Sequence, residues 1–402
     1  SRNKIFKSVI PYGKHSINKD DIISVKKTLL SNNLTQGHEI KRLEDLVAEY
    51  VGSKYAVSVS SCTAGLHLAC MALGVNKKSN YLTSPNSFVS TANAAKYCGS
   101  NVIFSDISLS SLNLDPLELE KKLKTNNIDF IGFVDFSGQA AGLSEIRKIT
   151  KKKGIKIIED AAHGFGGKYH CGSKIGSNKY SDVTVFSFHP VKILAGGEGG
   201  IITTNDRDIY EKILSLRTHG IVGNLKKQNF VRKKLAYTNG KKNPWYYDMQ
   251  NLGMHYRQTD IHASLIISQF QRLSKFLNKR KEIAKRYDKI FKENKIIKPY
   301  QNKFRNLSSN HLYVVDIDFQ NINISRAEFI NRLGDYKIKT QVHYIPVYAH
   351  SYYYYKNYKQ KKIQLNNMEK YYKNCLSLPL YYDLKFDQQR YVVEKIKKII
   401  NS

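Results

Sequence analysis

Short apolar segments alternate with amphipathic ones between residues 55 and 204, and this alternation limits the possible folds more than any other feature of the chain. The first strand-like segment covers residues 55–59, and helical patterns separate most of the later ones. The later segments lie at residues 81–83, 102–104, 130–134, 156–158, 183–186 and 200–203. Strands that alternate with helices form a mainly parallel sheet with helices on both faces. The alternation therefore predicts an α/β fold with a mainly parallel, mixed sheet.

Amphipathic patterns predict the helices that cover this sheet. Apolar residues recur at helical spacing in residues 20–31, 38–51, 65–73, 87–97, 117–124 and 143–153. The last two strands, around Val183 and Gly200, are joined by a segment too short for a helical crossover. We therefore expect an antiparallel strand at this end of the series.

The C-terminal third has a different pattern, which indicates a second domain. A long helix rich in lysine and arginine is predicted at residues 259–293. The other elements predicted there are strands at residues 311–317 and 340–344 and helices at residues 326–333 and 388–399. A chain of 402 residues is long enough for two domains. We predict a large domain over residues 1–255 and a smaller α+β domain over residues 256–402.

The charge of the chain is strongly positive, with 65 Lys and Arg against 33 Asp and Glu and a net charge of +32. Such an excess is typical of proteins that bind nucleic acid or anionic membranes. Residues 222–247 contain seven Lys or Arg and no acid, and we interpret them as a flexible surface insertion. Basic residues interleaved with aromatics in a nucleic-acid-binding fold are not evident. Abundant Lys, Asn, Ile and Tyr are explained by an AT-rich genome, so we expect no nucleic-acid partner and keep a basic nucleic-acid-binding protein as the alternative from a different functional class.

The five cysteines are scattered and form no CxxC pair, which argues against a disulfide framework or a zinc ribbon. We expect no metal site. No run of about 18 apolar residues predicts a membrane-spanning helix. The polar, basic residues 1–7 are unlike a secretory signal, and we expect a cytoplasmic protein without a membrane partner.

Lys192 lies in the segment 186–192, between the last two predicted strands and just before a glycine-rich stretch at residues 196–200. A nucleophilic lysine must lose its proton, and a constrained loop between strands suits this better than a solvated helix face. Glycines beside it let the backbone approach a bulky cofactor. Taken alone, one lysine among so many is far more often a surface residue.

Two further segments lie at the ends of predicted strands. Asp160 ends an apolar segment in the region where open α/β sheets bind ligands, and a buried carboxylate there needs a cationic partner. A helix N-cap is the structural alternative for Asp160. Residues 60–64 lead from a strand into a helix, and the free N–H groups of a helix N-terminus bind phosphate. Ordinary capping by serine or threonine is the alternative there.

Together these segments supply a phosphate cradle, an acid that keeps a pyridinium nitrogen protonated and a Schiff-base lysine, which are the groups that pyridoxal 5′-phosphate needs. At these residues the chain resembles the DegT/DnrJ/EryC1/StrS family of sugar-nucleotide aminotransferases, which have the fold-type-I aminotransferase architecture. The resemblance covers residues 10–382, and within the family it is greatest to the members of pseudaminic acid biosynthesis. The other segments that carry it are residues 10–13, 34–37, 244–247 and 342–347.

The resemblance implies a role for each matching residue. Lys192 is the catalytic lysine, which forms the Schiff base and moves the proton of the reaction. Asp160 pairs with the pyridine nitrogen, His163 lies near the phenolic oxygen of the cofactor, and Phe88 stacks on the pyridine ring. The residues around the cofactor phosphate are Cys62, Thr63, Ala64 and Ser187.

The chain departs from the family pattern at two of these positions. Cys62 stands where the family usually has glycine, which leaves the backbone donors in place. His255 stands where asparagine commonly reaches into the phosphate site of the partner subunit, and a histidine still donates a hydrogen bond there. On the sugar-nucleotide side, the resemblance implies that Thr35, Arg257 and His343 contact the substrate.

The resemblance also implies a reaction. L-Glutamate donates its amino group through pyridoxamine phosphate to C4 of a UDP-linked 4-keto-6-deoxy-N-acetylhexosamine. The product is a UDP-4-amino-4,6-dideoxy sugar for pseudaminic acid-type surface glycans. Two chains form a homodimer with shared active sites, in which His255 and Arg257 serve the partner's cofactor. One alternative is an aminotransferase for a different 4-keto or 3-keto nucleotide sugar. A second is a dehydratase of the same fold, whose members carry histidine in place of Lys192.

Overall fold

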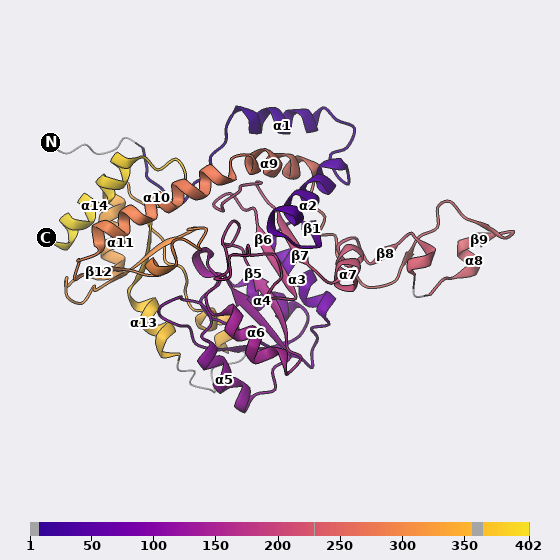
Figure 1. Ribbon diagram of the computed structural model, residues 1–402, viewed down its shortest axis with the longest axis horizontal. Coiled ribbons are helices and arrows are strands. Elements are labelled where there is room, and N and C mark those ends of the chain that lie inside the picture. The colour runs from indigo at the N-terminus through magenta and orange to yellow at the C-terminus, as the bar shows by residue number, and fades with distance from the viewer. Residues whose placement is uncertain (1–7, 229, 356–364, 402) are drawn as a thin grey trace.

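The computed structural model describes residues 8–228, 230–355 and 365–401, and a seven-stranded sheet lies at its centre (Figure 1). The strands stand in the order β1-β7-β6-β5-β4-β2-β3. Their bounds are β1 Tyr55–Val59, β2 Asn80–Thr83, β3 Asn101–Phe104, β4 Phe130–Val134, β5 Lys156–Asp160, β6 Val183–Ser187 and β7 Gly200–Thr204. β7 runs antiparallel to both of its neighbours, and the other paired strands are parallel. The predicted mixed, mainly parallel sheet is confirmed.

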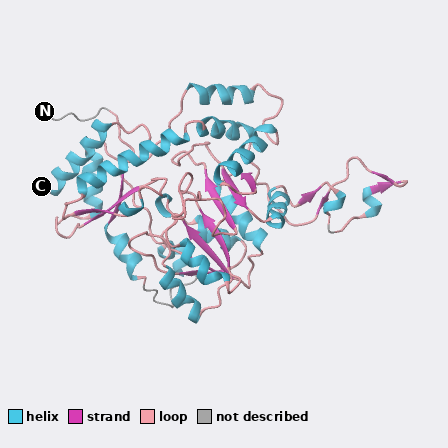
Figure 2. Cartoon of the chain, viewed as in Figure 1, coloured by secondary structure: helices cyan, strands magenta, loops and turns pink. Residues whose placement is uncertain are grey.

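Helices cover both faces of this sheet, as the alternation predicted (Figure 2). Successive residues of a strand point to opposite faces. Ile158 and Ile202 therefore join one core cluster, while Ile157 and Ile201 join the other. Helices on the first face are α3 (Cys62–Leu73), α4 (Ser90–Tyr97) and α7 (Arg207–Arg217). Helices on the second face are α2 (His38–Val51), α5 (Pro116–Thr125), α6 (Leu143–Lys151) and α9 (Asp260–Phe270).

Two element boundaries differ from the prediction in ways that matter for the site. Helix α3 begins at Cys62, three residues before the predicted start at Gly65, because Ser61 caps it and accepts a hydrogen bond from the amide of Ala64 at 3.1 Å. Strand β5 continues beyond residue 158 to Asp160, which pairs with Val185 of β6. Both changes bring side chains of interest to the carboxyl-terminal edge of the sheet.

The long helix predicted at residues 259–293 is two helices, α9 and α10 (Leu273–Phe291), so this prediction is wrong. The chain bends at Arg272, whose guanidinium donates to the carboxylate of Asp21 at 2.5 Å and to the carbonyl of Ser16 at 3.2 Å. Asp21 lies on α1 (Lys19–Leu29), which packs along α9. This long-range ion pair lies where α9 ends and α10 begins.

A three-stranded antiparallel sheet forms the centre of the C-terminal region. Its strands are β12 (Ile297–Pro299), β13 (Tyr313–Ile317) and β14 (Cys375–Leu378), in that order. The helices nearby are α11 (Arg326–Asp335), α13 (Asn366–Asn374) and α14 (Phe386–Ile400). The prediction of a strand at residues 340–344 is wrong. These residues make one β-bridge, between Gln341 and Ser377, and then turn into a loop, where His343 bonds the hydroxyl of Ser377 through its ring.

The two parts of the chain share core contacts. Ala263 and Ile266 of α9 pack with the large sheet, although they follow the predicted boundary at residue 255. Ile10, near the N-terminus, pairs with Ile338 and packs in the core cluster of the C-terminal region. The division into residues 1–255 and 256–402 stays a prediction.

Residues 221–228 and 230–249 project from the body as a narrow arm, at the right of Figure 1. Strands β8 (Ile221–Val222) and β11 (Asp248–Met249) pair at its base. Beyond them lie helix α8 (Lys233–Ala236) and a hairpin of β9 (Tyr237–Thr238) and β10 (Lys241–Lys242). The predicted insertion is thus a surface element, and its flexibility stays a prediction. In the described part of the chain, no helix is both long and apolar enough to cross a membrane.

Candidate active site

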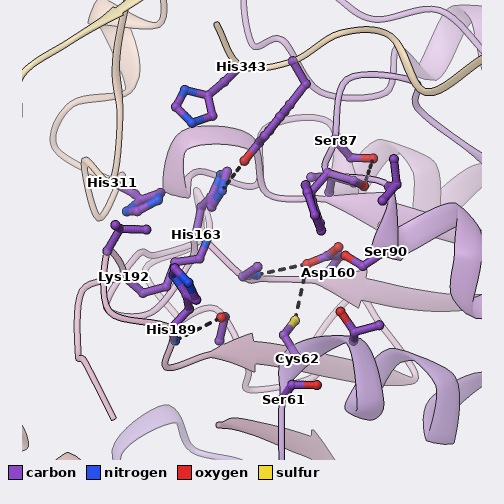
Figure 3. A pocket seen from close by; sticks show the side chains of 18 of the residues that line it. Ser61, Cys62, Ser87, Ser90, Asp160, His163, His189, Lys192, His311 and His343 are labelled. Atoms are coloured by element: carbon purple, nitrogen blue, oxygen red, sulfur yellow. Dashed lines mark hydrogen bonds between the residues drawn. The ribbon is translucent and has the colours of Figure 1, made fainter. Parts of the chain in front are cut away.

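A cavity of about 750 Å³ opens at the carboxyl-terminal edge of the large sheet, beside loops of the C-terminal region (Figure 3). Its wall contains residues from segments that are far apart in the sequence. The predicted site residues among them are Cys62, Thr63, Phe88, Asp160, His163, Ser187, Lys192 and His343. The structure therefore brings most of the predicted residues to one place.

Lys192 lies in a short loop that leaves β6 and returns as β7. The amide of Phe188 donates to the carbonyl of Gly199 at 2.9 Å, and the amide of Gly196 donates to the carbonyl of Phe188 at 2.7 Å. Burial lowers the pKa of Lys192 to about 8, although nearby Cys62 and Asp160 act to raise it. A sizeable fraction of this lysine is neutral near pH 8, as a nucleophile or base requires.

Gly200, where β7 begins, permits a close approach of two backbones. A Cβ at this position would lie 2.8 Å from the amide nitrogen of Cys62 and from the carbonyl oxygen of Ser61. The glycine thus lets the lysine loop pass directly over the N-terminus of α3.

The N-terminus of α3 presents donors to the cavity wall. The first N–H groups of a helix have no partner within the helix, and at α3 these belong to Cys62 and Thr63, which line the cavity. The amide of Ala64 instead donates to the hydroxyl of Ser61, and Ala64 lies outside the cavity wall. The arrangement can hold an anion such as a phosphate.

Asp160 ends β5 with its carboxylate held by three donors. The hydroxyl of Thr91 donates to Oδ2 at 2.5 Å, the amide of Ala162 to Oδ1 at 3.1 Å, and the thiol of Cys62 lies 4.0 Å from Oδ1. Burial raises the pKa of Asp160, and the bonds from Thr91 and Ala162 and the charge of Lys192 oppose this rise. The donors favour a buried carboxylate that can pair with a cationic ring nitrogen.

His163 and His343 are both buried in the cavity wall. The Nδ1 atom of His163 accepts the amide of Ser137 at 3.2 Å, and its Nε2 atom lies 3.1 Å from the hydroxyl of Tyr344. Burial lowers the pKa of His163 well below its ordinary value and that of His343 to about 3. Both imidazoles are therefore neutral at physiological pH.

Phe88 and Ser187 complete the predicted part of the wall. The Phe88 ring is 61% exposed and lies 6.4 Å from the Tyr344 ring, centroid to centroid. Its open face is available for stacking. The hydroxyl of Ser187 accepts the amide of His189 at 3.3 Å.

Thr35, His255 and Arg257 lie outside the cavity of this chain. Thr35 forms a β-bridge with Thr259. The guanidinium of Arg257 lies 2.9 Å from Nε2 of His255. The residue between these two, Tyr256, accepts the amide of Ser60 at 2.8 Å, so the segment runs beside the N-terminus of α3.

Sequence reasoning assigned no role to several residues of the wall. His311 comes from the segment just before β13, and Glu198 and His189 come from the lysine loop. His189 and Glu198 lie three and six residues from Lys192 in the sequence, so this proximity could have identified them as candidate site residues. His311 lies more than a hundred residues from every other predicted cofactor residue except His255, and only folding places it here. Among the described residues, no group of three or more His, Cys, Asp or Glu could hold a metal ion.

Residues 15–397 match the DegT/DnrJ/EryC1/StrS aminotransferase family. The chain belongs to this family. It is 36% identical over 394 residues to the spore coat polysaccharide biosynthesis protein SpsC of Bacillus subtilis, with 97% of each chain covered. It is 36% identical over 403 residues to the UDP-4-amino-4,6-dideoxy-N-acetyl-beta-L-altrosamine transaminase of Campylobacter jejuni, which covers 97% of this chain and 99% of the relative.

Solved structures agree with this membership. The aminotransferase PseC of Helicobacter pylori, involved in the biosynthesis of pseudaminic acid, superposes with a TM-score of 0.86 at 27% identity, covering 98% of this chain and all of PseC. The sugar aminotransferase Spr1654 of Streptococcus pneumoniae, in its PLP form, superposes with a TM-score of 0.82 at 25% identity, covering 98% and 99%. The predicted fold-type-I architecture, the sugar aminotransferase activity and pyridoxal phosphate as cofactor are confirmed.

Proposed function

We propose that this aminotransferase moves the amino group of L-glutamate to C4 of a UDP-linked 4-keto-6-deoxy-N-acetylhexosamine. The product is a UDP-4-amino-4,6-dideoxy sugar for a pseudaminic acid-type surface glycan. The observation that carries the proposal is the match over nearly the whole chain to the transaminase of C. jejuni, combined with a cavity that gathers the lysine, acid and helix N-terminus.

The residues of the cavity fit pyridoxal phosphate. The amides of Cys62 and Thr63 would hold its phosphate, the carboxylate of Asp160 its ring nitrogen, and the ring of Phe88 one of its faces. When bound, the cofactor supplies an electron sink that acidifies the neighbouring C–H bond. His163 would donate from Nε2 to the phenolic oxygen of the cofactor.

Lys192 serves two purposes in this proposal. Its neutral Nζ would hold the cofactor at its aldehyde carbon, and when released it would take up and give back the proton of the reaction. The lowered pKa, about 8, suits both tasks because Nζ gains and loses a proton near physiological pH. The neighbouring histidines, His163 and His343, are neutral and add no positive charge that would hinder Nζ of Lys192 from taking up a proton.

A second copy of the chain completes the site in our proposal. The described residues that line the cavity include no arginine, and Lys192 is their one lysine. A nucleotide diphosphate and a cofactor phosphate both call for further cations. His255 and Arg257 lie together outside the cavity of their own chain and are suited to serve the partner's phosphate groups, while Thr35 and His343 contact the sugar nucleotide.

The experiment that tests the cofactor roles is an absorption spectrum. Purified protein with pyridoxal phosphate should show the visible band of the lysine-bound cofactor, and Lys192→Ala should abolish it. Lys153→Ala, at an exposed position in the turn after α6, is the matched control and should retain the band. An unchanged spectrum in Lys192→Ala would overturn the assignment.

The substrate is tested with a panel of UDP- and dTDP-linked 4-keto and 3-keto sugars and glutamate as donor. The proposal expects the UDP-4-keto-6-deoxy-N-acetylhexosamine to have the highest kcat/KM. The similarity to SpsC, a protein of spore coat polysaccharide biosynthesis, favours a second candidate, an aminotransferase for a different keto sugar. Preference for another member of the panel would select that candidate.

A further inference from the structure

His311 lies against His163 in the cavity wall, and none of the roles described above uses it. The two ring centroids are 4.4 Å apart with an interplanar angle of 38°, and His311 is 4% exposed. Both histidines also bond the same residue. The amide of Ser137 donates to Nδ1 of His163 at 3.2 Å, and the carbonyl of Ser137 accepts the amide of His311 at 3.0 Å. The side chains are labelled together in Figure 3.

Buried contacts hold His311 and its neighbours from behind. The guanidinium of Arg280 donates to the carbonyls of His311 at 3.2 Å and Leu380 at 3.1 Å. The hydroxyl of Ser309 donates to the carbonyl of His163 at 2.6 Å. The loops after β4 and β5 are thereby tied to the segment that precedes β13.

The bonding pattern selects one tautomer of His163. Because Nδ1 accepts an N–H, the proton of the neutral ring is on Nε2, which donates to the hydroxyl of Tyr344 at 3.1 Å. The ionisable groups that face the histidine pair are Lys192, His343, Arg280 and Tyr344, whose hydroxyl bonds His163. Burial is the main cause that lowers the pKa of both rings. Lys192 and His343 lower both further, Arg280 also lowers that of His311, and the two rings are neutral.

We propose that His311 is a positioning residue for His163. Its ring packs on the ring of His163 and excludes water, and its backbone, anchored by Ser137 and Arg280, keeps that ring in place. His163 is thereby held as the Nε2–H tautomer with this N–H directed into the cavity. The inference rests on the proposed function, in which this N–H would exchange the hydroxyl of Tyr344 for the phenolic oxygen of the cofactor.

The test uses three variants and a readout that needs no cofactor. His311→Phe keeps a flat ring, His311→Leu keeps apolar volume without it, and His311→Ala removes both. His170→Ala, which removes an exposed histidine outside this cavity, is the control. Nitrogen-15 NMR of ring-labelled histidine in the apo-protein reads the tautomer and charge of His163, whose signals are assigned by their loss in His163→Gln.

We expect wild type, His170→Ala and His311→Phe to keep a neutral Nε2–H His163 between pH 6 and 8. In His311→Ala and His311→Leu, His163 should gain a proton or exchange tautomers within this range. The pH midpoint of the visible absorption of the bound cofactor should shift in the same two variants, and cofactor affinity should fall about tenfold.

A His163 that stays neutral and Nε2–H in His311→Ala and His311→Leu would overturn the inference. So would protonation of His163 in His311→Phe, because the packed ring would then not be the cause. If His311→Ala does not fold, the comparison of the His163 tautomer and charge between His311→Phe and His311→Leu tests the inference. A failure of the proposed cofactor roles would show in the absorption experiment on Lys192→Ala and would leave the apo-protein NMR result unaffected.

Discussion

The cavity and the projecting arm contrast in how they hold their side chains. In the cavity, Asp160 is 4% exposed and accepts from Thr91 of α4, and His163 is 5% exposed and accepts from Ser137 in the turn after β4. In the arm, Trp245 is 73% exposed and Phe230 is 69% exposed. Burial shifts pKa values in the cavity, whereas the described residues of the arm join none of the three core clusters, and only a few of them, such as Ala236 and Tyr246, are buried. A two-stranded element of this kind is only marginally stable without further packing.

The contrast also explains the charge of the chain. The basic residues of the arm lie far from the lysine loop along the chain, and the cavity wall has one lysine among its described residues. Nearly all of the basic residues behind the net charge of +32 therefore lie outside the cavity wall. It can steer an anionic sugar nucleotide toward the protein, but it takes no part in the chemistry of the cavity.

The largest expected effect comes from the acid at the end of β5. Asp160→Asn removes the negative charge opposite the cofactor ring nitrogen, and we expect kcat/KM to fall by about 10³-fold, a loss of roughly 4 kcal/mol. Thr91→Val removes one donor to the same carboxylate, and we expect a loss of about tenfold. Steady-state kinetics checks both. Equal effects of the two substitutions would mean that the charge of Asp160 is not what matters.

The pH dependence of cofactor loading should follow Lys192. With a pKa of about 8, the neutral fraction of Nζ rises about tenfold between pH 7 and pH 9. Stopped-flow absorbance should therefore record a loading rate that increases about tenfold over this range and then levels. A rate that continues to rise toward pH 10.5 would indicate an ordinary solvated lysine.

The same shift has a consequence for the apo-protein. Since the folded-state pKa of Lys192 is below its unfolded value, the unfolded chain binds more protons between about pH 8 and pH 10.5. This group therefore destabilises the apo-protein at low pH, and its contribution to unfolding free energy rises with pH through that window. Lys192→Met should remove this rise in denaturant titrations, and an unchanged slope would contradict the lowered pKa.

Two glycines test the packing of the cavity against that of the arm. Gly200→Ala places a Cβ 2.8 Å from backbone atoms of Ser61 and Cys62, and we expect a loss of about 1–3 kcal/mol in unfolding free energy. Gly223→Ala, in the arm, meets nothing within 4 Å and should change stability by less than about 1 kcal/mol. Chemical denaturation compares the two directly. A Gly223 variant that is as destabilised as the Gly200 variant would show that the arm is closely packed.

The smallest effect on the folded chain is expected from the aromatic residues of the arm. Replacing Trp245 and Tyr247 together by serine should change the unfolding free energy of a single chain by less than about 0.5 kcal/mol, since both side chains are exposed. We predict that these exposed side chains contact the second copy of the proposed dimer, so the variant should dissociate at higher protein concentration than wild type. Sedimentation velocity measures the dimer dissociation constant, and an unchanged constant would show that the arm lies outside the dimer interface.

Much of the site could be predicted because it lies at strand ends. Lys192 follows β6, Asp160 ends β5 and Cys62 opens α3, and each position is marked by a local change from an apolar segment to a polar or glycine-rich one. The predicted secondary structure is wrong at two places where contacts with a residue distant in sequence determine the local conformation. Asp21 and Ser16 bond the arginine at which the predicted long helix breaks, and Ser377 bonds His343 where a strand was expected.

The sequence by itself determined the α/β architecture, because hydrophobic periodicity is a local property. It also marked candidate residues at strand ends, to which the family resemblance assigns roles. The tertiary structure alone decided which residues support them. Thr91 reaches Asp160 across 69 positions of sequence, and Tyr344 reaches His163 across 181. His311 joins them from the segment just before β13. Such pairings depend on how the sheet and the C-terminal region pack, and no local pattern encodes that packing.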